Sequence, residues 1–116
     1  MSVITLLHNP NCSKSRQTLA LLQEHGAQLH VVEYLQHPPS VEELGQILSA
    51  LELSPRQLMR TKESIYLDLN LADTALNDTD LINAMVDHPI LIERPIAIKD
   101  GSAAIGRPPE NVLALL

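Results

Sequence analysis

The sequence predicts an open α/β sheet with a block of helices inserted before its last two strands. Two observations predict this class. A strand, a helix and a second strand follow one another over residues 3–34, which is the order of a right-handed βαβ unit. Towards the other end, an Asp-Gly pair at 100–101 separates two short apolar runs, which is a strong signal for an antiparallel hairpin.

Each element of the N-terminal βαβ unit has its own signal. The run VITLLH (3–8) is apolar and rich in β-branched residues, which is typical of a buried strand, and NPN ends it. The segment SKSRQTLALLQEHG opens with polar residues, carries Leu19 and Leu22 on an apolar face and stops at Gly26. We therefore expect a helix there, followed by a second strand over QLHVVEY (28–34).

Capping boxes mark helix starts in the middle of the chain. Ser40 with Glu43 precedes the apolar pattern of SVEELGQILSAL, and Ser54 with Gln57 does the same for SPRQLMR, with proline at the first helical position. The segment DTDLINAMVDHP predicts a further capped helix that ends before its proline. Residues 40–88 are thus expected to be mostly helical.

The C-terminal segment closes the sheet. PIAIK (95–99) and SAAIG (102–106) predict the two strands of the hairpin. A last helix is expected over ENVLALL, because Pro108 and Pro109 stand where a helix can begin and the following apolar face is dense.

Composition narrows the class of protein. The chain has 116 residues, 45% of them hydrophobic but only 2% aromatic, so we expect one aliphatic core. A net charge of −6 and few aromatic residues argue against a nucleic-acid binder. No apolar run approaches the roughly 20 residues of a membrane span, and a single cysteine excludes an internal disulfide. A soluble cytoplasmic protein is expected.

Cys12 in HNPNCSKSR is the first candidate for chemistry. It falls in the loop between the first strand and the first helix, where free amides and the helix dipole stabilise a thiolate. His8, Lys14 and Arg16 lie close in sequence, and Ser15 can direct a hydroxyl at the sulfur. The alternative is a small buried side chain, which is the usual state of a free cysteine.

Two sharper cysteine motifs do not fit. Ser15 stands where a Cys-x-x-Cys motif needs its second thiol, so no dithiol cycle is available within the motif. Thr18 stands where a Cys-x5-Arg phosphatase loop needs its arginine. Any thiol that resolves Cys12 must therefore come from another molecule.

Three arginines at element boundaries, Arg60, Arg94 and Arg107, are candidates for binding an oxyanion. The alternative is that they form surface ion pairs with nearby carboxylates, and spacing alone does not decide between the two. The candidate carboxylates are Glu63, Glu93 and Glu110. The five histidines show no paired ligand spacing, so no metal site is expected.

The ordered motifs HNPNCSKSR, LMRTKE, LNLAD, ERPI and IGRPPE resemble those of the glutaredoxin-linked arsenate reductase family, ArsC, and within it the YfgD-like branch. The resemblance spans nearly the whole chain. It implies one thioredoxin-like domain over residues 1–116, with a mixed four-stranded sheet and a helical insertion at about 40–88 before the C-terminal hairpin. It also implies a cis bond between Arg94 and Pro95.

The resemblance implies a reaction as well. Cys12 would attack arsenate, Arg60, Arg94 and Arg107 would bind the oxyanion, and His8 and Ser15 would tune the thiolate. Glutathione, as co-substrate, would attack the adduct, and glutaredoxin would remove the glutathione before arsenite leaves. No bound cofactor is expected, and the chain is expected to be a monomer.

Two alternatives stay open at this point. Ser13 and Lys14 stand where arsenate reductases of the family usually have Gly-Thr, which leaves room for a thiol oxidoreductase with another substrate. A non-enzymatic binding module like the Spx-type regulators shares the fold. Spx-type redox sensors use Cys-x-x-Cys, however, and Ser15 removes that switch.

Overall fold

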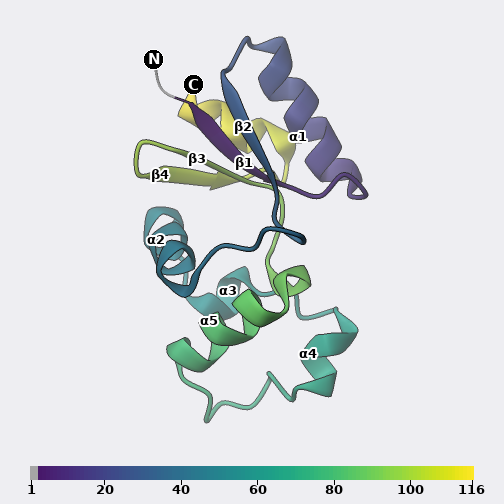
Figure 1. Ribbon diagram of the computed structural model, residues 1–116, viewed down its shortest axis with the longest axis vertical. Helices are drawn as coiled ribbons and strands as arrows, with labels where there is room; N and C mark the ends of the chain where they lie inside the picture. The colour runs from purple at the N-terminus through teal and green to yellow at the C-terminus, as the bar shows by residue number, and fades with distance from the viewer. Residues whose placement is uncertain (1–2) are drawn as a thin grey trace. The chain divides into compact units, whose positions relative to one another are not determined.

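A computed structural model of the chain describes residues 3–116, and Figure 1 shows its elements. The described residues form two compact units. One unit comprises the chain up to His37 together with Arg94–Leu116, and the other comprises Pro38–Glu93. The expectation of one domain over residues 1–116, with an insertion at about 40–88, stays a prediction.

The first unit contains the sheet, and its strands follow the predicted order along the chain. They pair in the order β2-β1-β3-β4, with β1 parallel to β2 and antiparallel to β3, and with β3 antiparallel to β4. The sheet is therefore mixed and four-stranded, which confirms the predicted fold class. The strands are β1 (Ile4–His8), β2 (Leu29–Glu33), β3 (Ile96–Lys99) and β4 (Ser102–Ile105).

A helix and a 3-10 segment line the core of the sheet unit. Helix α1 (Ser13–Glu24) packs on β1, and the segment η2 (Pro109–Leu115) packs on α1 and β4 (Figure 1). The buried core is aliphatic, as its composition predicts, and each of its Ile, Leu and Val side chains contributes about 1.5–3 kcal/mol when fully buried. Its members are Ile4, Leu6, Leu22, Ala97 and Val112.

The C-terminal segment differs from the sequence-based expectation of a last α-helix. Residues 109–115 form a 3-10 helix instead, with backbone bonds such as that from the Asn111 N–H to the Pro108 carbonyl. Proline at the start is compatible with an α-helix, but seven residues give little room for an α-helical nucleus to propagate. Packing on α1 and β4 therefore fixes this segment more than helix propensity does.

The hairpin between β3 and β4 confirms the Asp-Gly signal. Asp100 and Gly101 both have positive φ angles, 50° and 80°, which is the requirement of a two-residue type I′ turn. Lys99 and Ser102 are the paired residues that flank it. The turn sets the register of the hairpin, and this register brings Arg94 close to Arg107.

The second unit, Pro38–Glu93, is helical, as predicted for the middle of the chain. Capping boxes formed by Ser40, Ser54 and Asn77 open three of its helices, and α5 packs against α2, α3 and η1. Two short elements, α4 and η1, were not expected. Its elements are α2 (Val41–Leu51), α3 (Pro55–Leu58), α4 (Ser64–Asp68), α5 (Asp78–Asp87) and the 3-10 segment η1 (Pro89–Leu91).

Helix α3 is shorter than the sequence indicates, and this changes the place of Arg60. The helix ends at Leu58, and Met59 takes an extended conformation because it pairs with Ile92 in an antiparallel bridge. The Arg60 N–H donates to the Leu91 carbonyl at 2.7 Å. Arg60 therefore lies beyond the helix, next to a second segment of the same unit.

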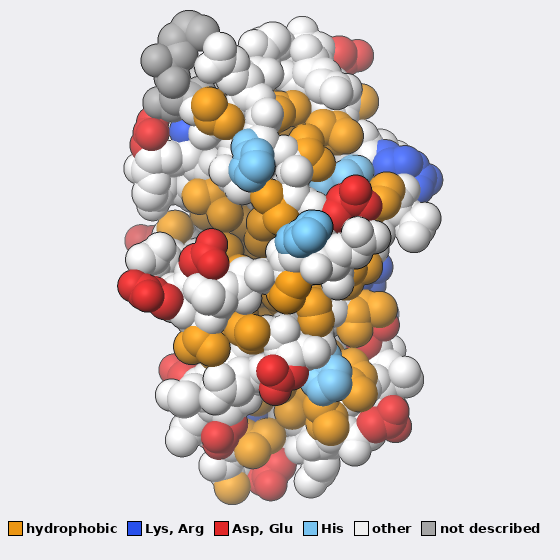
Figure 2. Space-filling model, in the orientation of Figure 1, with side chains coloured by type: hydrophobic (Ala, Val, Ile, Leu, Met, Phe, Trp, Pro, Cys, Tyr) orange, Lys and Arg blue, Asp and Glu red, His pale blue; other side chains and the backbone are white. Residues whose placement is uncertain are grey.

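Acidic side chains are spread over the face drawn in Figure 2, whereas Lys and Arg side chains lie towards its margins. Within residues 3–116, no helix is long and apolar enough to cross a membrane.

Candidate active site

The loop between β1 and α1 places Cys12 at the N-cap of the helix. Asn9 shapes this loop, since its side chain accepts the Asn11 N–H at 3.0 Å and its carbonyl accepts the Cys12 N–H at 3.0 Å. The Arg16 guanidinium donates to the Pro10 carbonyl at 2.8 Å, which ties the loop to the first turn of α1. The predicted position of Cys12, at the helix start, is confirmed.

The β-sheet register brings two arginines to the same place. In the hairpin Ile96 pairs with Ile105, so Arg94 and Arg107 flank the same end of β3 and β4. The Arg107 Nε donates to the Arg94 carbonyl at 2.7 Å. Because Leu7 pairs with Ile96, this end of the hairpin lies beside the end of β1, where the Cys12 loop begins.

Both guanidinium groups reach the Cys12 sulfur. The Arg107 Nη2 lies 3.5 Å from Sγ, and the Arg94 side chain also hydrogen-bonds the sulfur. The residue Cys12 is only 9% exposed, so these interactions operate away from bulk water. Arg94 precedes a cis peptide bond to Pro95, as the family resemblance implies, and a second cis bond joins Arg107 to Pro108.

The surroundings of Cys12 lower its pKa. Burial raises the pKa of the thiol, but the Ser15 backbone N–H, the Arg94 guanidinium and the Lys14 backbone N–H together lower it by more. The sulfur forms no regular capping hydrogen bond to the first amides of α1. The Ser15 and Lys14 amides that lower the pKa belong to the first turn of α1, where N–H groups have no partner within the helix.

A buried hydrogen-bond network lies behind the cysteine loop. The Ser15 Oγ lies 2.6 Å from His8 Nδ1 and accepts the Asn9 N–H at 3.0 Å. The hydroxyl of Ser15, which the sequence suggested could face the sulfur, thus bonds to these two groups, and Ser15 faces the sulfur with its backbone N–H.

The pKa of His8 is lowered, chiefly by burial. The charge of Glu33 opposes this shift, and the charge of Arg16 adds to it. A neutral His8 ring is also consistent with the network, since Ser15 still has its own proton to donate after accepting the Asn9 N–H.

Arg60 lies in the second unit and binds two carboxylates there. Its Nη1 lies 2.8 Å from Glu93 Oε1 and its Nε lies 3.2 Å from Glu63 Oε1. Burial lowers the pKa of Arg60, but the two carboxylates raise it above its ordinary value. Arg60 thus forms ion pairs with carboxylates, which was the alternative for the three arginines. The bridge between Met59 and Ile92 brings Arg60 close to Glu93.

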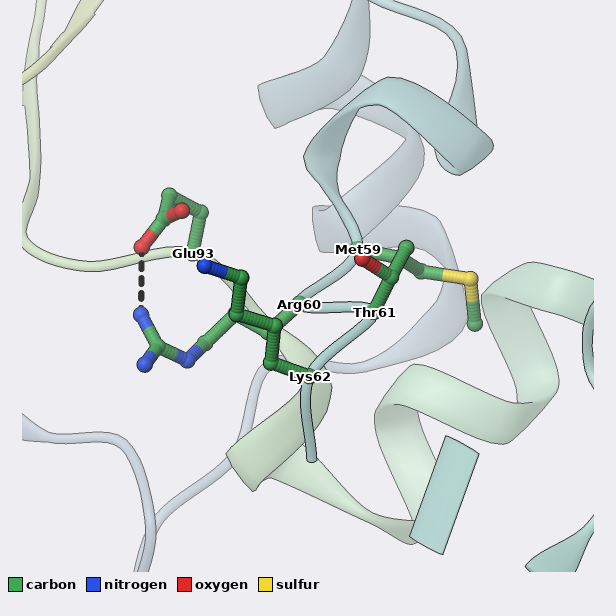
Figure 3. A pocket seen from close by; sticks show the side chains of 5 residues that line it. All are labelled: Met59, Arg60, Thr61, Lys62 and Glu93. Carbon is green, nitrogen blue, oxygen red and sulfur yellow. Dashed lines mark hydrogen bonds and ion pairs between the residues drawn. The ribbon is translucent and has the colours of Figure 1, made fainter. Parts of the chain in front are cut away.

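A pocket opens around the Arg60 side chain. Its lining residues are Met59, Arg60, Thr61, Lys62 and Glu93, and Figure 3 shows the Arg60–Glu93 ion pair at one side of it. Within residues 3–116, no group of three or more His, Cys, Asp or Glu side chains is placed to hold a metal ion.

Sequence reasoning missed the part that Asn9 plays. Its side chain and carbonyl both fold the loop that presents Cys12, and Asn9 is 6% exposed. The signal was available, because asparagine commonly forms such a turn with the N–H two residues later. The dipeptide Asn9-Pro10 indicated only the end of the strand.

The mixed sheet, with a cysteine at the N-terminus of α1 and arginines beside it, is that of a thioredoxin-like protein. Residues 7–115 match the model of the ArsC family, and the chain belongs to that family. The resemblance drawn from the ordered motifs is confirmed. The chain is 51% identical to the uncharacterized protein YfgD of Escherichia coli (strain K12), over 97% of its own length and 96% of that protein.

Two proteins that carry a functional name match over nearly the full length of both chains. The chain is 50% identical to the arsenate reductase of Haemophilus influenzae, over the whole of both chains. Among solved structures, the arsenate reductase from Vibrio cholerae superimposes with a TM-score of 0.95, at 50% identity and with 98% of each chain covered. The whole fold of the chain is thus similar to that of a protein described as an arsenate reductase.

Proposed function

We propose that the chain is a thiol-dependent arsenate reductase in which Cys12 is the nucleophile. The observation that carries the proposal is the position of the Cys12 sulfur. The Arg107 guanidinium lies 3.5 Å from this sulfur, and the Arg94 guanidinium is hydrogen-bonded to it. The relatives described as arsenate reductases, from Haemophilus influenzae and Vibrio cholerae, support arsenate as the substrate.

In the first step the Cys12 thiolate attacks the arsenic atom. A sulfur–arsenic bond forms, and one arsenate oxygen leaves as water after protonation. Arg94 and Arg107 neutralise the charge of the remaining oxygens, and a hydrogen bond to a charged group contributes about 1.5–3 kcal/mol. The Arg94 guanidinium also supports the thiolate, so this one charge acts on both reactants.

The second step needs thiols from other molecules, because the chain has one cysteine. The glutathione thiol attacks the arsenic atom of the adduct, and a second oxygen leaves as water. A glutaredoxin thiol then attacks the glutathione sulfur, breaks its bond to arsenic and leaves as the mixed disulfide. Two thiols are oxidised to one disulfide, and their two electrons take As(V) to As(III). Hydrolysis of the remaining Cys12–arsenic bond releases arsenite and restores the thiol.

Arg60 is proposed as the third oxyanion ligand on the strength of the family resemblance. Its Nε and Nη1 are bound by Glu63 and Glu93, which leaves the N–H donors of Nη2 for an oxyanion. His8 and Ser15 are proposed as positioning residues. Their hydrogen bond fixes the first turn of α1, whose amides support the thiolate.

The test is arsenate-dependent oxidation of glutathione in the presence of glutaredoxin. We expect Cys12→Ser to reduce turnover to the rate without enzyme, because an alcohol at this position does not ionise near neutral pH. Ser102→Ala, an exposed residue of β4, serves as the control and should retain full activity. If wild-type and Cys12→Ser chains turn over equally, the proposal is wrong.

A thiol oxidoreductase with another substrate is the second candidate. The observation in its favour is that Ser13 and Lys14, which replace the usual Gly-Thr, are exposed on the first turn of α1 beside Cys12. Reduction of a glutathione mixed disulfide by the wild-type chain, together with no turnover of arsenate, would favour this candidate.

A further inference from the structure

Gly106, the residue that follows β4, is tightly packed between two neighbouring segments. Gly106 is buried, and its N–H donates to the Pro95 carbonyl at 2.9 Å. On its other side lies Thr18 of α1, whose hydroxyl donates to the Lys14 carbonyl at 2.8 Å and lies 3.5 Å from the Gly106 carbonyl. Gly106 thus lies between the helix and the segment that leads into β3.

There is no room for a side chain at this position. A methyl group on Gly106 would overlap the Thr18 Oγ1 and would lie 2.8 Å from the Pro95 Cγ. Thr18 is fully buried and Pro95 is buried, so neither neighbour can turn away into solvent. The requirement for glycine here comes from this close approach, since the φ angle of Gly106 is not positive.

The two neighbours of Gly106 are directly connected to the active-site groups. Pro95 follows Arg94, and Gly106 itself precedes Arg107, so both guanidinium-bearing residues adjoin the contact in sequence. Thr18 lies on α1, the helix whose N-cap is Cys12. The spacing between α1 and this contact therefore sets how closely both arginines approach the sulfur.

We propose that Gly106 is a positioning residue of the active site, whose missing side chain lets Arg94 and Arg107 reach the Cys12 sulfur. The inference rests on the proposed function only in taking Cys12 as the reactive thiol. It concerns the ionisation of that thiol, which is measured without arsenate.

The experiment compares the alkylation of Cys12 by iodoacetamide across a range of pH. In Gly106→Ala the added methyl group displaces the arginine-bearing segments from α1, so the guanidinium groups lose contact with the thiolate. We expect the pH of half-maximal alkylation rate to rise by about one unit, which is about tenfold less thiolate at neutral pH. A merely structural role would lower the melting temperature without moving this profile.

The control is Gly45→Ala in α2, where an added methyl group meets nothing within 4 Å. It should leave the alkylation profile unchanged. A folded Gly106→Ala chain with the wild-type profile would overturn the proposal.

A second pair of variants covers the case in which Gly106→Ala does not fold. Thr18→Ala removes the overlap on the helix side, and Gly106→Ala/Thr18→Ala then retains only the contact with Pro95. The double variant should titrate at higher pH than Thr18→Ala alone, and identical profiles would overturn the proposal.

Arsenate turnover of the same variants separates the two proposals. If the wild-type chain reduces arsenate, Gly106→Ala should raise the KM for arsenate. If the wild-type chain does not reduce arsenate, the proposed function fails, and the alkylation profiles still decide the role of Gly106.

Discussion

Two opposed effects act on the Cys12 sulfur. Burial favours the neutral thiol, whereas the Ser15 amide, the Arg94 guanidinium and the Lys14 amide favour the thiolate and lower the pKa overall. The thiolate is therefore stabilised by fixed charges and dipoles rather than by water. If an oxyanion binds the Arg94 guanidinium, as proposed, it takes part of this support and makes the sulfur a stronger base.

His8 makes folding stability depend on pH in a defined window. Its folded pKa lies below its ordinary value of 6.5, and the residue is 7% exposed. Well above pH 6.5 both the folded and the unfolded chains carry a neutral ring, so His8 has no effect on the pH dependence there. As pH falls below 6.5 the unfolded chain binds the proton first, and the free energy of unfolding decreases by up to about 1.4 kcal/mol per pH unit.

The prediction is tested by urea unfolding at several pH values between 7.5 and 5. His8→Gln should decrease the slope of unfolding free energy against pH, because glutamine has no proton to gain in this range. His37→Gln replaces an exposed histidine and is the matched control for surface titration. An unchanged slope in His8→Gln would contradict the assignment of His8 as the buried titrating group.

Among the arginines, local sequence could not distinguish the sulfur-binding pair from Arg60. All three stand at element boundaries, and each has an acidic residue nearby in sequence or next to it. The difference comes from long-range pairing. The hairpin register directs Arg94 and Arg107 to Cys12, whereas the bridge between residues 59 and 92 directs Arg60 to Glu93.

The helix caps are the elements in which sequence and structure agree most directly. In α2 the Ser40 Oγ accepts the Glu43 N–H at 3.1 Å, and the Glu43 carboxylate accepts the Ser40 N–H at 3.1 Å. Ser40→Ala should lower the free energy of unfolding by about 1 kcal/mol, since the helix loses the acceptor for one of its free N–H groups. Urea denaturation measures this directly.

The matched control lies in the same helix. Ser49 is exposed in the last turn of α2, and Ser49→Ala should be neutral or slightly stabilising because alanine has the higher helix propensity. Equal losses in both variants would show that serine-to-alanine replacement, and not the cap, accounts for the effect.

The elements that sequence reasoning predicted are those with local signals of their own. Apolar runs predicted the four strands, capping boxes predicted α2 and α3, and the Asp-Gly pair predicted the turn. The helix α4 has five residues and no side-chain cap, so neither an apolar periodicity nor a capping motif in the sequence predicted it. The 3-10 form of residues 109–115 depends on packing against α1 and β4, which is invisible in the sequence.

At the scale of the whole molecule, the candidate site depends on the topology of the sheet. Antiparallel pairing of β1 with β3, and of β3 with β4, brings residues from both ends of the chain to Cys12. No spacing rule predicts this, and only the family resemblance grouped Cys12 with Arg94 and Arg107. Gly106 had no sequence signal, because its importance comes from a contact with α1.

An oxyanion that binds the folded chain should stabilise the whole molecule. Arsenate, phosphate or sulfate at a concentration of 100 times its Kd should add about 2.7 kcal/mol to the free energy of unfolding. A thermal melt with increasing oxyanion measures this as a rise in Tm. Arg94→Gln and Arg107→Gln should decrease the rise, because each removes a bidentate donor next to the sulfur.

The same titration tests the proposed role of Arg60. If Arg60 is an oxyanion ligand, Arg60→Gln decreases the rise in Tm as the other two substitutions do. If the rise in Tm is unchanged in Arg60→Gln, Arg60 does not bind the oxyanion and only forms its ion pairs with Glu63 and Glu93. Chloride at matched ionic strength controls for general screening of charge.

The scarcity of aromatic residues gives the molecule a useful optical property. The chain has no tryptophan and two tyrosines, Tyr34 in the sheet unit and Tyr66 in the helical unit, and both are buried. Each compact unit therefore contains one intrinsic fluorophore. Tyr34→Phe and Tyr66→Phe variants leave a single emitting residue each, so the melting of the two units can be followed separately without an added label.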